Sequence, residues 1–405
     1  MASITKRGNT YLIRVSCGRD INDKQIIQST TWVPDVSKTD KQNEKALKQF
    51  AMEFEAKVKS GRYLDGEKMT FKEFSEKWLV EYAQLQLEKT TTAFYETMLN
   101  THILPAIGHL KLSCIQPAHL NKLYMDMLTQ RKDGKEGGYS PATVKRAHAT
   151  ICSIMSTALQ WNIILDNPCE RVKPPKQARN SNDVVFFTLE QSEDFLSELE
   201  KETKEGTIKL QHNIFMQLAL FCGMRRGEIV ALTWSDIDFE NNMISISKST
   251  SIINGKPITK VPKNETSKRM VTVPGHIMKL LKRYHIEYNT YRLTIGSQWE
   301  GNDYVFIQWN GAQMYPSTPY SIFKDIIIRY NAEHDDKLPN IPLHGLRHTS
   351  ATLLISQNVD VKTVSNRLGH AQTSTTMNIY SHSLQKKDVA AADTLENLFQ
   401  RRKHG

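Results

Sequence analysis

The sequence lacks the features that would tie it to a membrane, a disulfide framework or a zinc site. No stretch holds eighteen consecutive apolar residues, so no membrane-spanning helix is predicted. The segment Met1–Arg7 has no apolar core, which argues against a signal peptide. The five cysteines, at positions 17, 114, 152, 169 and 222, form no C-x-x-C pair, so we expect reduced thiols. There is no internal repeat or low-complexity segment. These absences predict a soluble protein of the cytoplasm.

What the sequence does have is length and positive charge. The chain has 405 residues, too many for one ordinary core, which predicts two or three domains. Its 39% hydrophobic and 24% charged residues are typical of a globular protein. The net charge of +10 favours a polyanionic partner, but it is weak support alone because many basic proteins bind no nucleic acid.

Residues 1–65 are predicted to form a small α+β domain. Strands are expected over residues 9–16 and 24–33, with a turn over 17–23, and a helix over 40–60. Basic side chains on such a sheet could read a DNA groove: Lys6, Arg7, Arg14, Arg19 and Lys24. The alternative is a solvated basic face on a small capping domain.

Residues 66–171 are predicted to form an all-α domain. Thr70 and Glu73 have the spacing of a capping box at a helix start. Further helices are expected over residues 89–104, ending at Pro105, from Pro117 onward, and over 141–161. Lys89, Lys145 and Arg146 could contact phosphates, although each alone is more typical of a solvated helix charge.

Residues 172–184 are predicted to be an extended basic linker containing Lys173 and Lys176. Residues 185–405 then form a mixed, mainly α domain with a small antiparallel sheet. Its helices are expected over 208–221, 277–291 and 321–330, and its strands over 243–248 and 268–273 with another between them. An amphipathic stretch over 389–399 could dock on a neighbouring molecule.

The residues that could carry chemistry lie in this last domain. Metal-free phosphoryl transfer needs a nucleophile, cations around the phosphate and an acid for the leaving oxygen. Arg225 and Arg347 are suited to the phosphate, because a guanidinium binds two oxygens and keeps its charge. His344 and His370 could hold the phosphate and relay protons, and Lys263 lies in a turn where it could act as the acid. Tyr380 is the candidate nucleophile, because a tyrosyl phosphodiester would keep the bond energy.

Each of these residues also has a plainer interpretation. Arg225 could be a structural arginine paired with Glu228. The i, i+4 pair His344 and His348 has a spacing seen in zinc helices, but no third ligand or H-E-x-x-H glutamate accompanies it. Taken alone, Tyr380 is no better a nucleophile than Tyr320 or Tyr330.

The order of four motifs removes most of this ambiguity. They are Cys222–Glu228 (CGMRRGE), His344–Thr349 (HGLRHT), Leu368–His370 (LGH) and Asn378–Tyr380 (NIY). With them the chain resembles the tyrosine recombinases, and among these the integrases of temperate phages and of integrative conjugative elements of Gram-positive bacteria. Cys222 stands where that family usually has threonine.

The resemblance implies three domains: an arm-type DNA-binding domain, a SAM-like core-binding domain and a catalytic domain with a trans-packing tail. It implies that Tyr380 attacks DNA to give a 3′-phosphotyrosyl link, with strand exchange through a Holliday junction in a tetramer. Lys263 matches the general acid, although Lys260 and Lys268 remain alternatives. The implied partners are double-stranded DNA with core-type and arm-type sites, an excisionase and a host DNA-bending protein, at the bacterial nucleoid. No cofactor is implied.

Two other functions remain open from the sequence. A type IB topoisomerase would use the same nucleophile chemistry without a defined site. A non-catalytic DNA-binding protein would need none of the six catalytic residue types.

Overall fold

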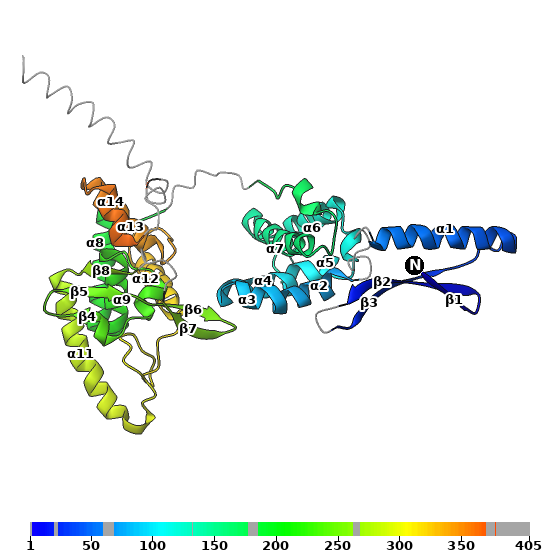
Figure 1. The fold of residues 1–405 in the computed structure, drawn as a ribbon. Helices are drawn as coiled ribbons and strands as arrows, with labels where there is room; N and C mark the ends of the chain where they lie inside the picture. The colour runs from blue at the N-terminus through cyan, green and yellow to red at the C-terminus, as the bar shows by residue number, and fades with distance from the viewer. Residues whose placement is uncertain are drawn as a thin grey trace, which may run out of the picture. The chain divides into compact units, whose positions relative to one another are not determined.

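The computed structural model describes residues 2–19, 23–59, 69–131, 133–176, 185–261, 268–369 and 377. The chain divides into two compact units, Met1–Ala178 and Arg179–Gly405, and Figure 1 shows their elements. Within the described residues, no helix has both the length and the apolar character needed to cross a membrane.

The first unit begins with a three-stranded antiparallel sheet. Its order is β1 (Ser3–Arg7), β2 (Thr10–Arg19) and β3 (Gln25–Trp32), and it is followed by helix α1 (Asp40–Lys59). Ile13 and Val15 point from β2 into a core with four residues of α1, Leu47, Ala51, Phe54 and Val58. Because side chains alternate along a strand, Arg14 lies on the face away from α1.

Two sequence predictions for this sheet need correction. Strand β1 was not predicted, because Ser3–Arg7 is exposed throughout and carries no apolar alternation. The predicted turn over 17–23 is also wrong at its start, because β2 continues to Arg19. The register shifts between Ser16 and Arg19, where Gly18 has φ +92°. A bulge that uses glycine looks like turn chemistry in the sequence.

Helices make up the rest of the first unit. They are α2 (Phe71–Trp78), π-helical η2 (Leu79–Ala83), α3 (Gln84–Gln86), α4 (Lys89–Met98), π-helical η3 (Leu99–Ile103), α5 (Leu104–Ile107), the 3₁₀ turn η4 (Leu112–Cys114), α6 (Pro117–Thr129), α7 (Pro141–Gln160) and the 3₁₀ turn η5 (Pro168–Arg171). Their shared core includes Phe71, Phe74, Trp78, Ile151 and Ile154.

The starts of these helices follow the sequence signals closely, but one end does not. The Thr70–Glu73 capping box is confirmed, with the Glu73 backbone N–H donating to Thr70 Oγ1 at 3.2 Å. The predicted stop at Pro105 is wrong, because the chain remains helical to Ile107. Pro105 lies in the first turn of α5, where its missing N–H costs little.

The second unit is mainly helical around one central helix. Its helices are α8 (Leu189–Glu205), α9 (Leu210–Phe221), α10 (Arg226–Val230), α11 (Gly275–Ile295), α12 (Thr318–Glu333), α13 (Gly345–Ser356) and α14 (Val361–Leu368), with 3₁₀ turns η6 (Trp234–Asp236) and η8 (Gly296–Gln298). Helix α9 buries nearly every side chain and contacts α8, α10, α11, α12 and α13. A helix that is apolar on all sides belongs in the middle of a core.

The strands of this unit form two small antiparallel sheets. One has the order β4 (Ile237–Asp238), β5 (Met243–Ile246) and β8 (Arg269–Thr272), and the other is the hairpin of β6 (Ser249–Ile253) and β7 (Lys256–Lys260). The prediction of one strand between β5 and β8 is therefore wrong in number. The hairpin pairs with itself, from Ser249 with Lys260 to Ile253 with Lys256, and not with the larger sheet.

Candidate active site

The site is built around the tight turn between α9 and α10. Helix α9 ends at Phe221 with Cys222 as its C-cap, Gly223 follows with φ +60°, and Arg225 is the N-cap of α10. A Cβ on Gly223 would lie 2.3 Å from Leu368 Cδ2, so glycine is required by packing as well as by its dihedral angle. The turn therefore brings the Cys-Gly-Met-Arg motif against the Leu-Gly-His motif.

A buried carboxylate holds Arg225 in place. Glu228 Oε2 accepts the Arg225 backbone N–H at 2.9 Å, and Glu228 Oε1 accepts from Arg225 Nη1 at 2.9 Å. Arg269 donates to the same carboxylate, from Nη2 to Oε2 at 2.9 Å and from Nη1 to Oε1 at 3.2 Å. Burial opposes ionisation of Glu228, but the hydrogen bonds and charges of Arg269 and Arg225 outweigh it and lower the pKa.

The plain interpretation of Arg225 as a partner of Glu228 is thus confirmed as geometry. The ion pair leaves part of the guanidinium accessible, because the Arg225 side chain is 38% exposed while that of Glu228 is 5% exposed. The ion pair orients the arginine and leaves part of it open to a ligand.

Arg225 and Arg269 also bond the backbone at the end of α14, in and just before the Leu-Gly-His motif. Arg225 Nη2 donates to Gly369 O at 3.2 Å, and Arg269 Nε donates to Arg367 O at 2.8 Å. Gly369 ends α14 with φ +67°, and a Cβ there would lie 2.7 Å from Arg269 Nη1. The backbone immediately before His370 is therefore fixed by two cations.

The His-Gly-Leu-Arg motif forms the start of α13. Arg347 is 2% exposed and donates from Nη1 to Gly223 O at 2.6 Å. His344 lies at the N-cap and is exposed, and its ring meets that of His348 edge-on at 4.9 Å between centroids. His348 is partly buried.

His344 is neutral at neutral pH in this setting. Desolvation by the surrounding protein, with the positive charges of His348, Arg347 and Arg225, lowers the pKa of His344 to about 4. The side chain nevertheless lies at the surface, so the neutral ring can exchange a hydrogen bond with a bound ligand.

Arg225 and His344 line a pocket of about 620 Å³. Its lining comes from three parts of the chain, namely Arg225, Arg226 and Gly227 at the start of α10, Ser249–Ile252 of β6, and Tyr320 with Pro342, Leu343 and His344. Cationic and polar groups therefore converge on one hollow, which is the arrangement that a phosphate diester requires.

Three of the six predicted catalytic residues are brought together here: Arg225, His344 and Arg347. The other three, Lys263, His370 and Tyr380, lie outside the described residues. The sequence prediction missed Arg269, although a signal exists. Arg269 shares strand parity with the buried Val271 and Val273, and an arginine on the inward face of a strand requires a buried partner.

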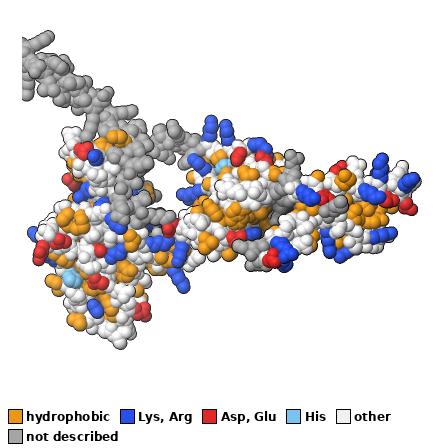
Figure 2. Space-filling view, in the orientation of Figure 1, with side chains coloured by type: hydrophobic (Ala, Val, Ile, Leu, Met, Phe, Trp, Pro, Cys, Tyr) orange, Lys and Arg blue, Asp and Glu red, His pale blue; other side chains and the backbone are white. Residues whose placement is uncertain are grey.

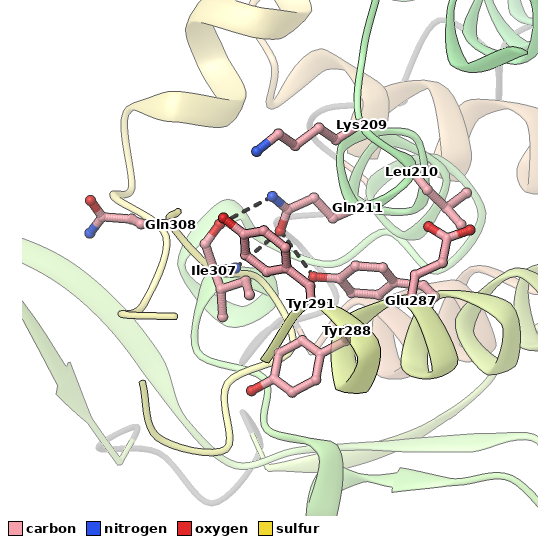
Figure 3. Close-up of a pocket in the computed structure, with 9 residues that line it drawn as sticks. Lys209, Leu210, Gln211, Glu287, Tyr288, Tyr291, Ile307 and Gln308 are labelled. Carbon is pink, nitrogen blue, oxygen red and sulfur yellow. Dashed lines mark hydrogen bonds between the residues drawn. The ribbon is translucent and has the colours of Figure 1, made fainter. Parts of the chain in front are cut away.

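A second hollow, of about 350 Å³, lies at α11 and carries no comparable chemistry. Figure 3 shows Tyr288, Tyr291 and Glu287 beside Gln211 and Ile307. The Tyr284 hydroxyl donates to Val305 O at 2.9 Å, and the Gln211 amide group bonds both the N–H and the C=O of Ile307. These polar groups satisfy one another, so they hold the core together.

The predicted DNA-contacting residues are all at the surface of the first unit, over which Figure 2 shows Lys and Arg side chains spread. Arg14, Arg19 and Lys24 belong to the sheet region, where Arg19 Nη1 pairs with Asp23 Oδ2 at 2.8 Å. The remainder lie on α4, on α7 or just after η5: Lys89, Lys145, Arg146, Lys173 and Lys176. Arg146 also lies over the ring of Phe94, 6.0 Å from its centroid.

Two family models match this chain. The phage integrase family matches residues 186–387, and the N-terminal SAM-like domain of phage integrases matches residues 70–128. The SAM-like match begins at the Thr70 cap and ends within α6, and the integrase match lies within the second unit, which contains the arginine pocket.

Similar proteins agree over most of the chain. A XerC-like tyrosine recombinase of Caldanaerobacter subterraneus subsp. tengcongensis is 27% identical over 96% of both chains. The ICEBs1 integrase of Bacillus subtilis is 31% identical over 66% of this chain and 69% of its own. The solved structure of the Tn1549 transposon integrase in complex with a circular intermediate DNA has the same fold. It covers 81% of this chain and all of that one, with a TM-score of 0.66 at 20% identity.

The fold and the matches define a DNA strand transferase. The chain belongs to the phage integrase family of tyrosine recombinases, like the integrases of phages and conjugative elements. It is a site-specific recombinase that integrates and excises DNA, and the topoisomerase and non-catalytic alternatives are not favoured.

Proposed function

We propose that Tyr380 attacks a DNA phosphate to form a 3′-phosphotyrosyl bond and release a 5′-hydroxyl. Arg225 and Arg347 bind the non-bridging oxygens, and neutral His344 donates a hydrogen bond to one of them. Lys263 protonates the leaving 5′-oxygen and His370 assists at the phosphate. Strand rejoining reverses the step with a new 5′-hydroxyl, so no external energy source is needed.

The observation that best supports this proposal is the contact between motifs distant in sequence. Arg225 Nη2 bonds Gly369 O at 3.2 Å, and Arg347 Nη1 bonds Gly223 O at 2.6 Å. Each arginine is therefore tied to the backbone of another motif, beside a pocket that His344 also lines. Such cross-ties preorganise the cations before substrate arrives.

The test is covalent trapping of the protein on a nicked suicide duplex that carries the attachment site of its element. The wild-type chain should form a protein–DNA adduct, and Tyr380→Phe should form none. Absence of an adduct with wild type refutes the catalytic assignment. Tyr320→Phe is the competing variant, because Tyr320 is 46% exposed and lines the same pocket. Loss of the adduct with Tyr320→Phe and its retention with Tyr380→Phe would move the nucleophile to Tyr320.

We further propose the domain roles. Residues 1–65 bind arm-type sites, residues 66–171 bind core-type sites, and residues 172–184 link them to the catalytic domain of residues 185–405. The exposed basic residues of the first unit support phosphate contacts. Deletion of residues 1–65 should leave core-site cleavage intact and impair integration. Equal integration by the truncated protein would count against the arm role.

The assembly we propose is a tetramer that exchanges strands through a Holliday junction at the bacterial nucleoid. An excisionase and a host DNA-bending protein set its direction. The tail after about Asp388 docks on a neighbouring protomer and controls the aim of Tyr380. A protein truncated there that cleaves and recombines normally would contradict this role.

A further inference from the structure

A second cluster of reactive groups lies in the helical part of the first unit, and recombination makes no use of it. It joins Tyr124 of α6, His148 and Cys152 of α7, and Cys169 of η5. The Tyr124 hydroxyl is 2.8 Å from His148 Nδ1, and His148 Nε2 is 3.3 Å from Cys152 Sγ. Element η5 packs against α7, and the Cys169 side chain there interacts with Cys152 and lowers the pKa of its thiol.

The hydrogen bonds of this cluster can all run toward one sulfur atom. Burial raises the pKa of Tyr124, so its hydroxyl keeps its proton and donates to Nδ1. That bond leaves the imidazole proton on Nε2, from which it points at Cys152 Sγ. With the Cys169 S–H as a second donor, Cys152 Sγ receives two hydrogen bonds, an arrangement that stabilises a thiolate.

The two thiols are accordingly unequal. The hydrogen bond from Cys169, opposed by burial and aided by His148, lowers the pKa of Cys152 to about 5. The same bond, with burial and the charges of Cys152 and Glu170, raises the pKa of Cys169. Cys152 is partly exposed whereas Cys169 is 3% exposed, so a small reagent reaches Cys152 first.

The backbone holds Cys169 beside α7. Asn167 caps η5 by accepting the Cys169 backbone N–H at 3.0 Å, and its Nδ2 donates to Ser156 Oγ of α7 at 3.2 Å. Neighbouring thiols held in this way need only a local adjustment to reach the S–S bond length.

We propose that Cys152 and Cys169 form an oxidisable dithiol whose substrate is a small hydroperoxide. The Cys152 thiolate attacks one peroxide oxygen, the O–O bond breaks, and the other oxygen leaves as hydroxide, which solvent protonates. The resulting sulfenic acid is attacked by Cys169 sulfur, which loses its proton as the S–O bond breaks and water leaves. Two thiols and one hydrogen peroxide thus give one disulfide and two waters.

The disulfide would cross-link α7 to η5 at the base of the segment that carries Lys173 and Lys176. The chain contains its own comparison thiols, because Cys17 and Cys114 are exposed and make no such network. Cys222 is a buried comparison, with its pKa raised to about 11 by burial.

The test uses the full-length chain and substoichiometric hydrogen peroxide between pH 5.5 and 8, with alkylation and peptide mass spectrometry. Over this range an ordinary thiol loses about tenfold in rate per pH unit as pH falls, whereas a preformed thiolate does not. At pH 6 we therefore expect Cys152 to react about tenfold faster than Cys17 and Cys114. Its product should be the Cys152–Cys169 disulfide.

Variants separate the two steps. Cys169→Ser should stop at a dimedone-reactive sulfenic acid on Cys152, and Cys152→Ser should leave Cys169 reduced. The proposal is overturned if wild-type Cys152 shows the same pH dependence as Cys17 and Cys114. It is also overturned if oxidation yields no disulfide within the chain. Both outcomes are read from wild-type protein, so a variant that fails to fold leaves the test intact.

Discussion

The two clusters of ionisable groups differ in how the chain assembles them. The cysteine cluster is local, because Tyr124, His148, Cys152 and Cys169 come from three neighbouring elements of one helical unit. The arginine cluster is assembled from residues that are far apart in the sequence. It ties Arg225 to Gly369, Arg269 to Arg367 and Arg347 to Gly223. A local cluster needs only its helices, whereas the arginine cluster exists only when the whole catalytic unit has folded.

They also differ in charge. The arginine cluster holds Arg225 and Arg269 against the single carboxylate of Glu228, with Arg347 nearby, so positive charge remains in excess. The cysteine cluster has one stabilised thiolate among neutral donors. The first therefore suits an anion such as a phosphate, and the second suits an electrophile.

The largest difference should appear in stability. Glu228→Ala leaves Arg269 buried without its carboxylate, so the free energy of unfolding should fall by about 3–5 kcal/mol. Tyr124→Phe removes one hydrogen bond from the local cluster and should cost about 1 kcal/mol. Urea unfolding measures both. Glu200→Ala is the surface control, because its pair with Lys204 is exposed to solvent and should contribute little to stability. Equal losses of unfolding free energy for Glu228→Ala and Tyr124→Phe would contradict the proposed difference in stability between the arginine cluster and the cysteine cluster.

Catalysis should separate the clusters almost as strongly. Arg225→Lys keeps the charge but loses the fork that bonds Glu228 and Gly369 and that we propose binds the phosphate. Single-turnover cleavage of a suicide substrate should slow by about 10²–10³-fold. Cys152→Ser, kept under reductant, should cleave at the wild-type rate. An Arg225→Lys protein that cleaves at the wild-type rate would contradict the proposal that the hydrogen bonds of Arg225 to Glu228 and Gly369 orient it for catalysis.

The pH dependence of stability should show whether His344 is neutral in the folded protein. Its folded-state pKa of about 4 lies below its ordinary value of 6.5, so the unfolded chain binds the extra proton first as pH falls. Its contribution is complete above pH 6.5 and is lost progressively toward pH 4. Glu228, whose pKa is also lowered, contributes above its ordinary value of 4.5 and loses that stability at more acidic pH. Urea midpoints from pH 4 to 7 should fall less steeply for His344→Gln than for wild type, and parallel curves would exclude His344 as the source.

The smallest expected effect concerns DNA binding by α7, which carries the cysteine cluster and the exposed Lys145 and Arg146. If Lys145 neutralises one phosphate, Lys145→Gln should reduce the salt slope of log K for core DNA by about 0.9. Lys204→Gln, a paired lysine on α8, is the control and should not change the slope. An unchanged salt slope for Lys145→Gln would show that Lys145 contacts no phosphate. It would also give no support to a link between oxidation of the α7 cysteine and DNA binding.

Much of this architecture follows from local sequence chemistry. The Thr70–Glu73 spacing, Pro117 and Pro141 each mark a helix start that the structure contains. Local hydrogen bonds decide these positions, so the sequence reveals them. Continuation through Pro105 depends on packing between distant segments, which no local pattern encodes. The β6–β7 hairpin does have a local signal, because its turn is Asn254-Gly255 with φ of +49° and +75°, and the prediction of a single strand missed it.

The candidate site divides in the same way. The residue types of Arg225, His344 and Arg347 predicted a common phosphate site, and the structure brings all three to one region. The sequence also paired Arg225 with Glu228 correctly. It missed Arg269, because the partners of Arg269 are tens of residues away and only its inward strand parity points to them. The roles of Lys263, His370 and Tyr380 stay predictions.

Gly223 gives this arrangement a narrow tolerance. Its carbonyl holds Arg347, and the space where its side chain would be is filled by Leu368. Only glycine is small enough to fit between the two motifs at this position. The methyl group of Gly223→Ala would overlap Leu368 of α14. We expect α14 to shift, which would weaken the hydrogen bond from Arg225 to Gly369 O. A substitution at Gly223 would thus disturb both Arg225 and Arg347, the two arginines that we propose bind the phosphate, without changing either of them.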